Sequence, residues 1–353
     1  MATIQQSTRA YEAWLKRELR GDIVRVDLAS KHKKMRDSAF VFFRATYWRW
    51  AETILEICPD LGGVPAVLAV GDIHLENYGT WRDAEGRLAW GVNDFDEAAE
   101  MPYALDLVRL ATSALLAATI SAAAACDAIL AGYAQGLRAP TPISLDRDYP
   151  LLRRLVEVSE KERAKFFERI AGATAEPAPP RYRTALAKAM PAPGLKIRTA
   201  RRMNAGAGSL GRPRWTADAV WRGSPVVREA KALVMSAWAR VHAPKATAIR
   251  GGEIANGRFH SLDPWYRIEN GLVLRRLSPN NRKIEVESLA GKLVSGEMLR
   301  LMGFELGNLH AGVADRREAI LRDLRRNKGW LVQAAKKAAK ACTQDFKAWR
   351  SGG

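Results

Sequence analysis

The first part of the chain contains one strongly apolar helical pattern followed by two short apolar runs. Residues 40–57 carry apolar side chains on every side and contain few helix breakers, which predicts a largely buried helix that ends before Pro59. Residues 64–70 and 87–92 have the length and apolar content of strands. Residues 83–86 between them are rich in turn formers, so we expect a hairpin-like arrangement.

Helical patterns return over 104–137 and 150–170. Residues 172–194 are rich in proline, which predicts a connector or domain boundary. Short apolar runs with Gly, Trp and Pro follow, and they are typical of a small, mainly antiparallel sheet. Helical patterns resume at Val286, and residues 316–350 form a basic amphipathic pattern with apolar positions at Ile320, Leu321, Leu324 and Leu331.

Composition places the chain among globular proteins with a sizeable core. The 353 residues are 48% hydrophobic and 27% charged, and this length corresponds to about two domains. Its three cysteines are too widely spaced for a disulfide framework or a zinc site. We expect a cytoplasmic location, because no secretory signal is visible and the longest uncharged stretch, 110–126, is shorter than a membrane-spanning helix.

The net charge of the chain favours anionic partners. The formal charge of +18 raises the local concentration of anions such as nucleotides, nucleic acid or acidic lipid headgroups. Charge by itself does not choose among them.

The segment "AVGDIHLENYGTW" places several polar groups between two apolar runs. Asp72 and Asn77 lie five residues apart, and Asp94 follows the second strand in "NDFDEA". Phosphoryl transfer needs such a set: one carboxylate to orient the acceptor hydroxyl, and an amide and a carboxylate to hold Mg²⁺. Magnesium favours oxygen ligands, so we expect Asn77 and Asp94 as ligands and Asp96 as a further one.

A second constellation lies about 130 residues downstream. The stretch "NAGAGSLGRPRW" places Gly206, Gly208 and Gly211 at G-x-G-x-x-G spacing. Glycines allow the backbone to approach phosphates and point its N–H groups at them. The strand-like run "VVREAKALV" follows with Arg228 and Lys231, either of which could contact a nucleotide phosphate.

These motifs resemble the protein kinase-like superfamily, and most closely its aminoglycoside phosphotransferase branch. "GDIHLEN" resembles the branch's catalytic loop, with Val70 and Gly71 in place of His-Gly, and "NDFDEA" its metal-binding motif. "YALDLVRLA" is similar to the helix start that follows. Over residues 36–312, the motifs "SAFVFFRATYW", "GDIHLENYG", "NDFDEA", "DLVRLATS" and "GAGSLG…REAKA" together resemble DUF2252, an uncharacterised bacterial family.

The resemblance implies an α+β, two-lobe, kinase-like fold that is circularly permuted. The glycine-rich segment and lysine follow the catalytic loop here, whereas in kinase-like enzymes they precede it, and "LMGFELGNLHA" at 301–311 resembles the helix that leads into that loop. The implied parts are a large-lobe part at 1–171 with the catalytic loop and metal motif, a connector at 172–194, a small sheet lobe at 195–285, and C-terminal helices at 286–353.

The same resemblance assigns roles residue by residue. Asp72 would be the catalytic base, Asn77 and Asp94 the metal ligands, and Gly206, Gly208, Ser209 and Gly211 the phosphate cover. Lys231 has the chemistry of the phosphate-binding lysine, whereas Arg228 aligns with it in the narrower family. Asp106 would brace the catalytic loop. ATP and Mg²⁺ are the implied cofactors.

Simpler interpretations exist for the same residues. "NDFDEA" could cap a helix, and the glycines suit an ordinary hairpin turn. We expect His74 to be a hydrogen-bonded loop histidine and Glu76 a structural or solvated carboxylate. Arg44 and Arg109 are charged residues in apolar helices, which favours ion pairs with Asp72 or Asp94.

Three hypotheses of function follow. The first is an ATP- and Mg²⁺-dependent phosphotransferase that acts on a hydroxyl of a small molecule or a protein, with an anionic acceptor favoured by the basic charge. The second is a kinase-like protein that binds nucleotide without phosphoryl transfer, or that transfers the nucleotidyl group. The third is a nucleic-acid or membrane-surface binding protein driven by the charge of +18.

Overall fold

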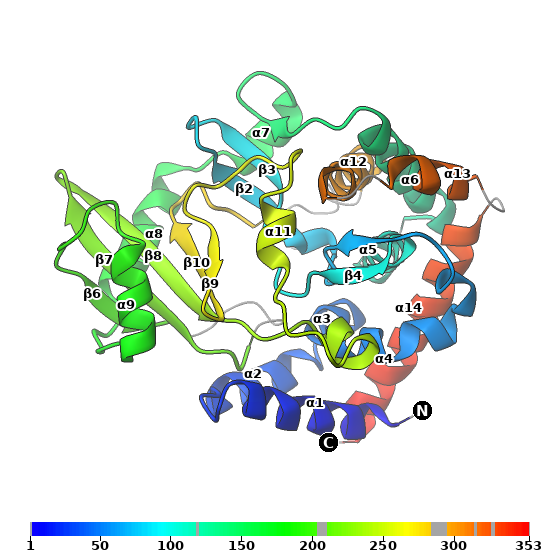
Figure 1. Ribbon diagram of the computed structural model, residues 1–353, viewed down its shortest axis with the longest axis horizontal. Helices are drawn as coiled ribbons and strands as arrows, with labels where there is room; N and C mark the ends of the chain where they lie inside the picture. The colour runs from blue at the N-terminus through cyan, green and yellow to red at the C-terminus, as the bar shows by residue number, and fades with distance from the viewer. Residues whose placement is uncertain are drawn as a thin grey trace.

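A five-stranded antiparallel sheet lies at one side of the molecule and a larger, mainly helical part at the other (Figure 1). The computed structural model describes residues 2–117, 120–202, 210–283, 295–313, 316–325 and 329–352. Helices and antiparallel sheets together make an α+β protein, as expected.

The large sheet has the strand order β6-β7-β8-β10-β9. Its strands are β6 (Arg198–Arg201), β7 (Arg214–Trp221), β8 (Ser224–Ala232), β9 (Arg267–Glu269) and β10 (Leu272–Leu277). The turn between β7 and β8 has positive φ at Arg222 and Gly223, 48° and 78°. Two consecutive left-handed residues form the type of turn whose twist matches a hairpin, which fixes the register of β7 on β8.

Two smaller sheets support the loops of the helical part. β1 (Ala66–Ala69) pairs with β4 (Ala99–Pro102), and β3 (Leu88–Val92) pairs with β2 (Tyr78–Arg82) and β5 (Ile143–Ser144). The two strands expected from the sequence both exist, but each has a different partner from the one that a simple hairpin implies. Residues 78–82, at the end of the polar segment "AVGDIHLENYGTW", also form a strand.

Helices make up most of the remaining chain. They are α1 (Ile4–Glu18), α2 (Arg25–Lys34), α3 (Ala39–Ala45), α4 (Tyr47–Ile57), η1 (Pro59–Leu61), η2 (Leu75–Asn77), α5 (Ala104–Ala117), α6 (Ala122–Arg138), α7 (Pro150–Val156), α8 (Glu160–Ala171), α9 (Pro180–Lys188), α10 (Ala237–His242), α11 (Gly251–Ala255), α12 (Gly296–Val313), α13 (Arg317–Asp323) and α14 (Trp330–Ser351).

Several predicted helices are shorter than the sequence pattern indicates. The helix expected over 40–57 is interrupted at Thr46, whose backbone leaves the helical region at φ −123° and ψ 41°. The pattern over 104–137 contains two helices, because Ser121 caps a new helix through its side chain. Ser159 does the same within 150–170 by a capping box with Glu162. The connector 172–194 contains α9, which packs on β7 and β8.

Close helix packing joins distant parts of the chain. α12 packs along α6, where Gly132 and Gly136 face the backbone of α12 and Gly303 and Gly307 face the backbone of α6. A Cβ atom at any of these glycines would overlap a main-chain oxygen of the other helix, so only glycine allows this separation.

The two chain ends lie side by side (Figure 1). Gln5 Nε2 donates to the Ala348 carbonyl at 2.8 Å, and the buried residues Ile4 and Trp349 belong to one small hydrophobic cluster. The apolar stripe predicted for the tail is confirmed at Ile320 and Leu331, both fully buried. In the described part of the chain, the helices all lack the length or the apolar character needed to cross a bilayer.

Candidate active site

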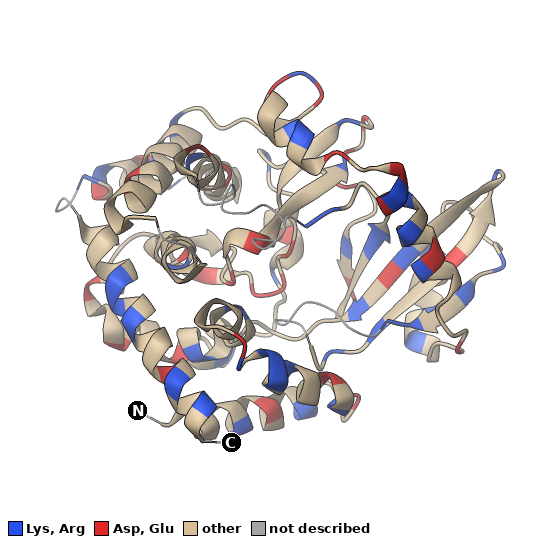
Figure 2. Ribbon diagram, turned by 180° about the vertical axis from the view of Figure 1, so that it is seen from behind, with Lys and Arg blue, Asp and Glu red and all other residues tan. Residues whose placement is uncertain are grey.

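A cavity of about 440 Å³ lies where the large sheet meets the loops that follow β1 and β3. Its acidic lining residues are Asp72, Glu76, Asp94, Asp96, Glu97 and Asp263. Its basic ones are Arg44, Arg169, Arg202, Arg212, Arg214, Arg275, Arg276 and Lys283. Figure 2 shows Lys and Arg positions on the strands of the large sheet and Asp and Glu positions in the loops next to it.

The loop after β1 is held in place by hydrogen bonds to Asp106. Its carboxylate accepts hydrogen bonds from the backbone N–H groups of Val70 and Gly71, at 2.8 and 2.9 Å. Gly71 has φ 81°, and a Cβ atom there would lie 2.7 Å from the Tyr47 hydroxyl oxygen. The expected bracing role of Asp106 is confirmed, and the tight turn that it stabilises requires glycine.

Asp72 faces the cavity and is paired with Arg109. Arg109 reaches it from the buried side, with both Nε and Nη2 donating to Asp72 Oδ1. Burial raises the pKa of Asp72, and the Arg109 guanidinium opposes that rise. Within the described residues, no group donates to the second carboxylate oxygen, Oδ2. The expected ion pair of Arg109 is therefore confirmed, and Asp72 keeps one oxygen for another partner.

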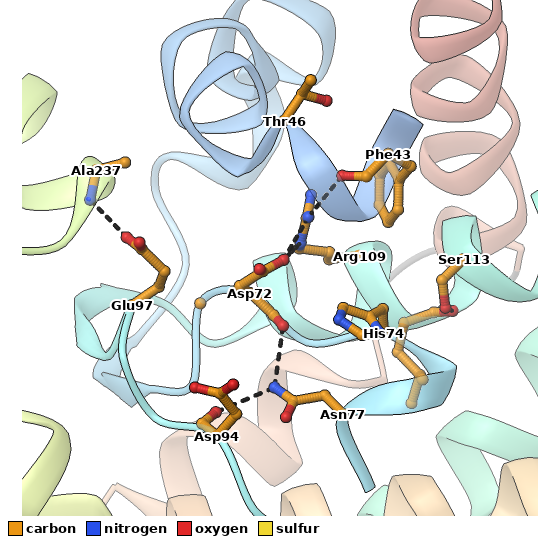
Figure 3. Close-up of polar contacts among 12 residues, drawn as sticks. Phe43, Thr46, Asp72, His74, Asn77, Asp94, Glu97, Arg109, Ser113 and Ala237 are labelled. Carbon is orange, nitrogen blue, oxygen red and sulfur yellow. Dashed lines mark hydrogen bonds and ion pairs between the residues drawn. The ribbon is translucent and has the colours of Figure 1, made fainter. Parts of the chain in front are cut away.

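Asn77 joins the two candidate loops. Its Nδ2 donates to the main-chain oxygens of Asp72 and Asp94, at 3.1 and 3.0 Å (Figure 3). The side chain is 2% exposed, and its Oδ1 has no hydrogen-bond partner among the described residues. A buried amide oxygen without a donor is costly, which makes Oδ1 a candidate ligand for a cation.

Two lysines from different segments meet Asp94. Its carboxylate lies 3.6 Å from Lys231 Nζ and 3.3 Å from Lys283 Nζ. Burial acts to raise the pKa of Asp94, but the attraction of Lys231 and Lys283 outweighs it and holds the pKa well below its usual range. Asp94 is therefore ionised at neutral pH.

Asp96 and Glu97 also line the cavity, and together with Asp72 and Asp94 they are here called the acidic wall. Asp96 forms ion pairs with Lys231 and with Arg212, the latter at 3.2 Å. Glu97 accepts from Arg212 at 2.7 Å and from the Ala237 backbone N–H at 2.6 Å. Arg212 thus ties the end of the glycine-rich segment to this wall.

Lys231 and Arg228 lie on opposite faces of β8. Side chains three positions apart in a strand point to opposite sides. Lys231 reaches Asp94 and Asp96, whereas Arg228 lies over the Trp265 ring at 4.0 Å and donates to the Ala189 carbonyl at 2.8 Å. Burial lowers the pKa of Arg228 to about 10. Neither residue lines the cavity, but Lys231 lies directly behind it, paired with the lining residues Asp94 and Asp96, whereas Arg228 has no such contact.

Of the predicted phosphate cover, Gly206, Gly208 and Ser209 lie outside the described residues. Gly211 is described, with φ 98°, and it packs against Leu28. Its carbonyl accepts a hydrogen bond from Val24 N at 3.0 Å, so it contacts the segment before α2 and does not line the cavity.

The remaining loop residues have supporting positions. His74 Nδ1 accepts from the Glu76 backbone N–H at 3.1 Å, which confirms a hydrogen-bonded loop histidine. Burial, with added repulsion from Arg44 and Lys283, lowers the pKa of His74 well below its usual value, so the ring is neutral. Among the described residues, Arg44 pairs with Glu76 and not with Asp72 or Asp94.

Oxygen donors at this site fit Mg²⁺. The Asn77 amide oxygen and the Asp94 and Asp96 carboxylates are of the type that magnesium prefers, and this ion commonly takes further ligands from water and phosphate. Within the part of the chain that the structure describes, no group of three or more His, Cys, Asp or Glu side chains could hold a metal ion. The Asp94 and Asp96 carboxylates already pair with lysine or arginine side chains, and the Asn77 amide oxygen is the donor left without a partner among the described residues.

Sequence reasoning missed Lys283 and Glu229. Lys283 follows β10 in a segment that runs beside β2, where Gly79 and Lys283 form a β-bridge. Glu229 is fully buried on β8 and pairs with three arginines. Lys283 belongs to no motif quoted above, whereas Glu229 stands within "VVREAKALV", two positions from Lys231, and so shares its face of the strand.

Comparison with known proteins finds a similar family for one part of the chain. A family model described as "Uncharacterized protein conserved in bacteria (DUF2252)" matches residues 24–139. This segment contains α2 to α6 and includes Asp72, Asn77 and Asp94. No curated protein and no solved structure matches the chain. Over residues 24–139 the chain is therefore similar to an uncharacterised bacterial family.

Proposed function

We propose that this protein transfers a phosphoryl group from Mg²⁺-ATP to a hydroxyl group of a small molecule or, as a second choice, of a protein. One observation carries the proposal. Asp72, Asn77 and Asp94 converge at one wall of a cavity whose other walls carry Lys283 and arginines from the large sheet. The volume of about 440 Å³ lies in the range of small-ligand pockets.

The large sheet supports a kinase-like interpretation. In protein kinases a glycine-rich loop covers the phosphates and the phosphate-binding lysine lies on the third strand. Here the glycine-rich segment connects β6 and β7, the first two strands of the sheet, and Lys231 lies on β8, the third. Lys231 also meets the acidic wall through Asp94 and Asp96.

Each acidic-wall residue has a distinct task in this proposal. Asp72 orients the acceptor hydroxyl and takes its proton, while Arg109 keeps the carboxylate in place. Asn77 and Asp94 would hold Mg²⁺, with Asp96 as a further ligand, and the bound ion would neutralise phosphate charge during transfer. Lys231 and Lys283 attract the phosphate groups into the cavity.

A circular permutation accounts for the order of the segments. The chain ends lie side by side, which is the condition under which permutation is tolerated. α12 ends next to the catalytic loop in space, because His310 Nε2 lies 3.1 Å from the Asp106 carboxylate that holds Val70 and Gly71. In other kinase-like chains a helix precedes this loop in the sequence. In the permuted order, α12 would take the place of that helix although it follows the loop in the sequence.

Replacement of Asp94 by Asn tests the proposal. We expect Asp94→Asn to abolish Mg²⁺-dependent turnover of ATP while the melting temperature changes little, because Lys231 retains its ion pair with Asp96. Asp218→Asn is the matched control: Asp218 pairs with Arg198 on the same sheet, outside the cavity lining. Turnover that survives in Asp94→Asn would refute the assignment of the metal site.

Nucleotidyl transfer is the second candidate, and one observation favours it. Protein kinases pair the strand lysine with a helix glutamate, whereas Lys231 pairs with Asp94 and Asp96 from the loop after β3. ATP labelled in the γ- or the α-phosphate separates the two reactions. Transfer of the γ-label supports phosphoryl transfer, and transfer of the α-label supports nucleotidyl transfer.

A further inference from the structure

Three arginines surround one buried carboxylate on the sheet side of the cavity. Glu229 accepts from Arg275 Nε at 2.7 Å, lies 3.6 Å from Arg214 Nη1, and also pairs with Arg202. Glu229 is fully buried, while Arg202, Arg214 and Arg275 all line the cavity. One carboxylate leaves two positive charges of this trio uncompensated.

Arg214 carries a donor without an acceptor. Its side chain is 6% exposed, and its Nε is buried with no hydrogen-bond partner in the described structure. Burial lowers the pKa of Arg214, and the neighbouring guanidinium groups of Arg275 and Arg202 lower it further, against the pull of Glu229. An unpaired buried donor on a cation is costly, so the site favours an anion that supplies oxygen acceptors.

The excess of positive charge continues along β8. Glu229 and Lys231 share one strand face and lie about 6.6 Å apart along the strand. Among the described residues, the ion pairs here link six cations with only four carboxylates: Arg202, Arg212, Arg214, Arg275, Lys231 and Lys283 against Asp94, Asp96, Glu97 and Glu229. This row of charged side chains therefore carries an excess of two positive charges that is spread over its length and not held at one point.

We propose that Arg202, Arg214 and Arg275 form a binding subsite for a chain of linked phosphates, with Glu229 as the carboxylate that holds the three guanidinium groups in place. This inference rests on the proposed function, because it deepens the same cavity. It names the ligand class as a di- or triphosphate, free or as part of a nucleotide.

The chemistry of the row selects phosphate chains over other anions. Guanidinium groups match the oxygens of phosphate in a two-point geometry, and a charged hydrogen bond is stronger than a neutral one. A single carboxylate or orthophosphate would reach only one end of a row that spans Glu229 and Lys231. A cavity of about 440 Å³ also excludes folded nucleic acid, so a small polyphosphate is the ligand that fits.

Calorimetric titration with inorganic phosphates, without Mg²⁺ and at physiological salt, tests the subsite. We expect the affinity of the full chain to increase from orthophosphate to pyrophosphate to tripolyphosphate. Arg214→Gln and Arg275→Gln should each weaken tripolyphosphate binding about tenfold, because each removes charged hydrogen bonds. Arg222→Gln, a change in the exposed turn between β7 and β8, should leave it unchanged.

Three results would overturn the subsite. The first is no binding of tripolyphosphate to the unmodified protein, and the second is that Arg214→Gln and Arg275→Gln bind it as tightly as the unmodified protein does. The third is that Arg222→Gln weakens binding as much as these two variants, which would mean general attraction to a basic surface. Melting temperatures without ligand identify a variant that fails to fold, and Arg202→Gln at the 31% exposed edge of the trio then replaces it. Tripolyphosphate binding needs neither metal nor turnover. Its failure is therefore distinguishable from loss of ATP turnover in Asp94→Asn.

Discussion

Arg109 donates two hydrogen bonds to the same oxygen of Asp72, from Nε at 3.0 Å and from Nη2 at 2.5 Å, while its own side chain is completely buried. The guanidinium carbon lies 4.1 Å from the centre of the Phe43 ring and 5.2 Å from that of Trp50. Aromatic faces stabilise a cation in a site without water. Asp72 is therefore oriented by a charge that solvent does not reach.

Loss of this guanidinium should destabilise the fold. We expect Arg109→Met to lower the free energy of unfolding by about 3 kcal/mol, because it leaves the half-buried Asp72 carboxylate without its partner. Urea denaturation measures the change. Arg163→Met, which removes an exposed pair with Glu160 on α8, should change stability little. Equal losses in the two variants would contradict the structural role of Arg109.

The stability of the two loops that Asn77 joins should depend on its amide nitrogen. Asn77→Asp removes the donor to the Asp72 and Asp94 carbonyls and places a third negative charge between them. We expect a loss of about 2 kcal/mol in the free energy of unfolding, since two part-buried carbonyls lose their donor. Asn256→Asp is the control, because Asn256 Nδ2 donates a single, solvent-exposed hydrogen bond to the Gly252 carbonyl. A variant as stable as the unmodified protein would show that the two loops do not need this link.

Asp106 should control the order of the loop that carries Asp72. Asp106→Asn replaces one of the two oxygens that accept from Val70 and Gly71 with a donor group, so one buried N–H loses its acceptor. We expect faster hydrogen exchange of these two amides, measured by mass spectrometry of peptides that cover 66–75. Asp323→Asn, which alters a hydrogen bond to Tyr103 elsewhere, should leave their exchange slow. Unchanged exchange in Asp106→Asn would contradict the bracing role.

Lys31 should make stability depend on pH in the alkaline range. The side chain is 3% exposed and lies 4.5 Å from the Trp48 ring centre, and burial lowers its pKa from 10.5 to about 8. Between these two values the unfolded chain binds more protons than the folded one, so stability from this group rises with pH. Between pH 8 and pH 10.5, the free energy of unfolding should rise on the order of 3 kcal/mol through this group.

Lys31→Met should remove that rise, because a side chain of similar length without a charge pays no desolvation cost. Chemical denaturation of both proteins at several pH values from 7 to 10.5 measures it. The variant is expected to be the more stable at pH 7, and the two curves should approach one another toward pH 10.5. Parallel curves over this range would show that Lys31 does not carry the effect.

Local pattern was enough for the class of fold and for the position of several elements. Short apolar runs identified β1 and β3, and the change of texture after residue 194 identified the antiparallel sheet. The breaks at Thr46 and Ser121 were missed, because apolar periodicity continues across them while a side chain or backbone angle ends the helix. Strand partners were also missed, since β1 pairs with β4 across about 30 residues.

For the candidate site, the sequence by itself determined which polar groups follow the strands: Asp72, Asn77 and Asp94 were predicted to lie together, and the structure joins them through the Asn77 amide. The tertiary structure alone decided that Lys231 pairs with Asp94 and Asp96, that Arg228 lies over Trp265, and that Lys283 and the arginines around Glu229 line the cavity. The physical reason is that apolar periodicity and turn chemistry act between near neighbours in the chain. Ion pairs depend on which charged groups share a buried space, and Asp94 meets Lys283 across 189 residues.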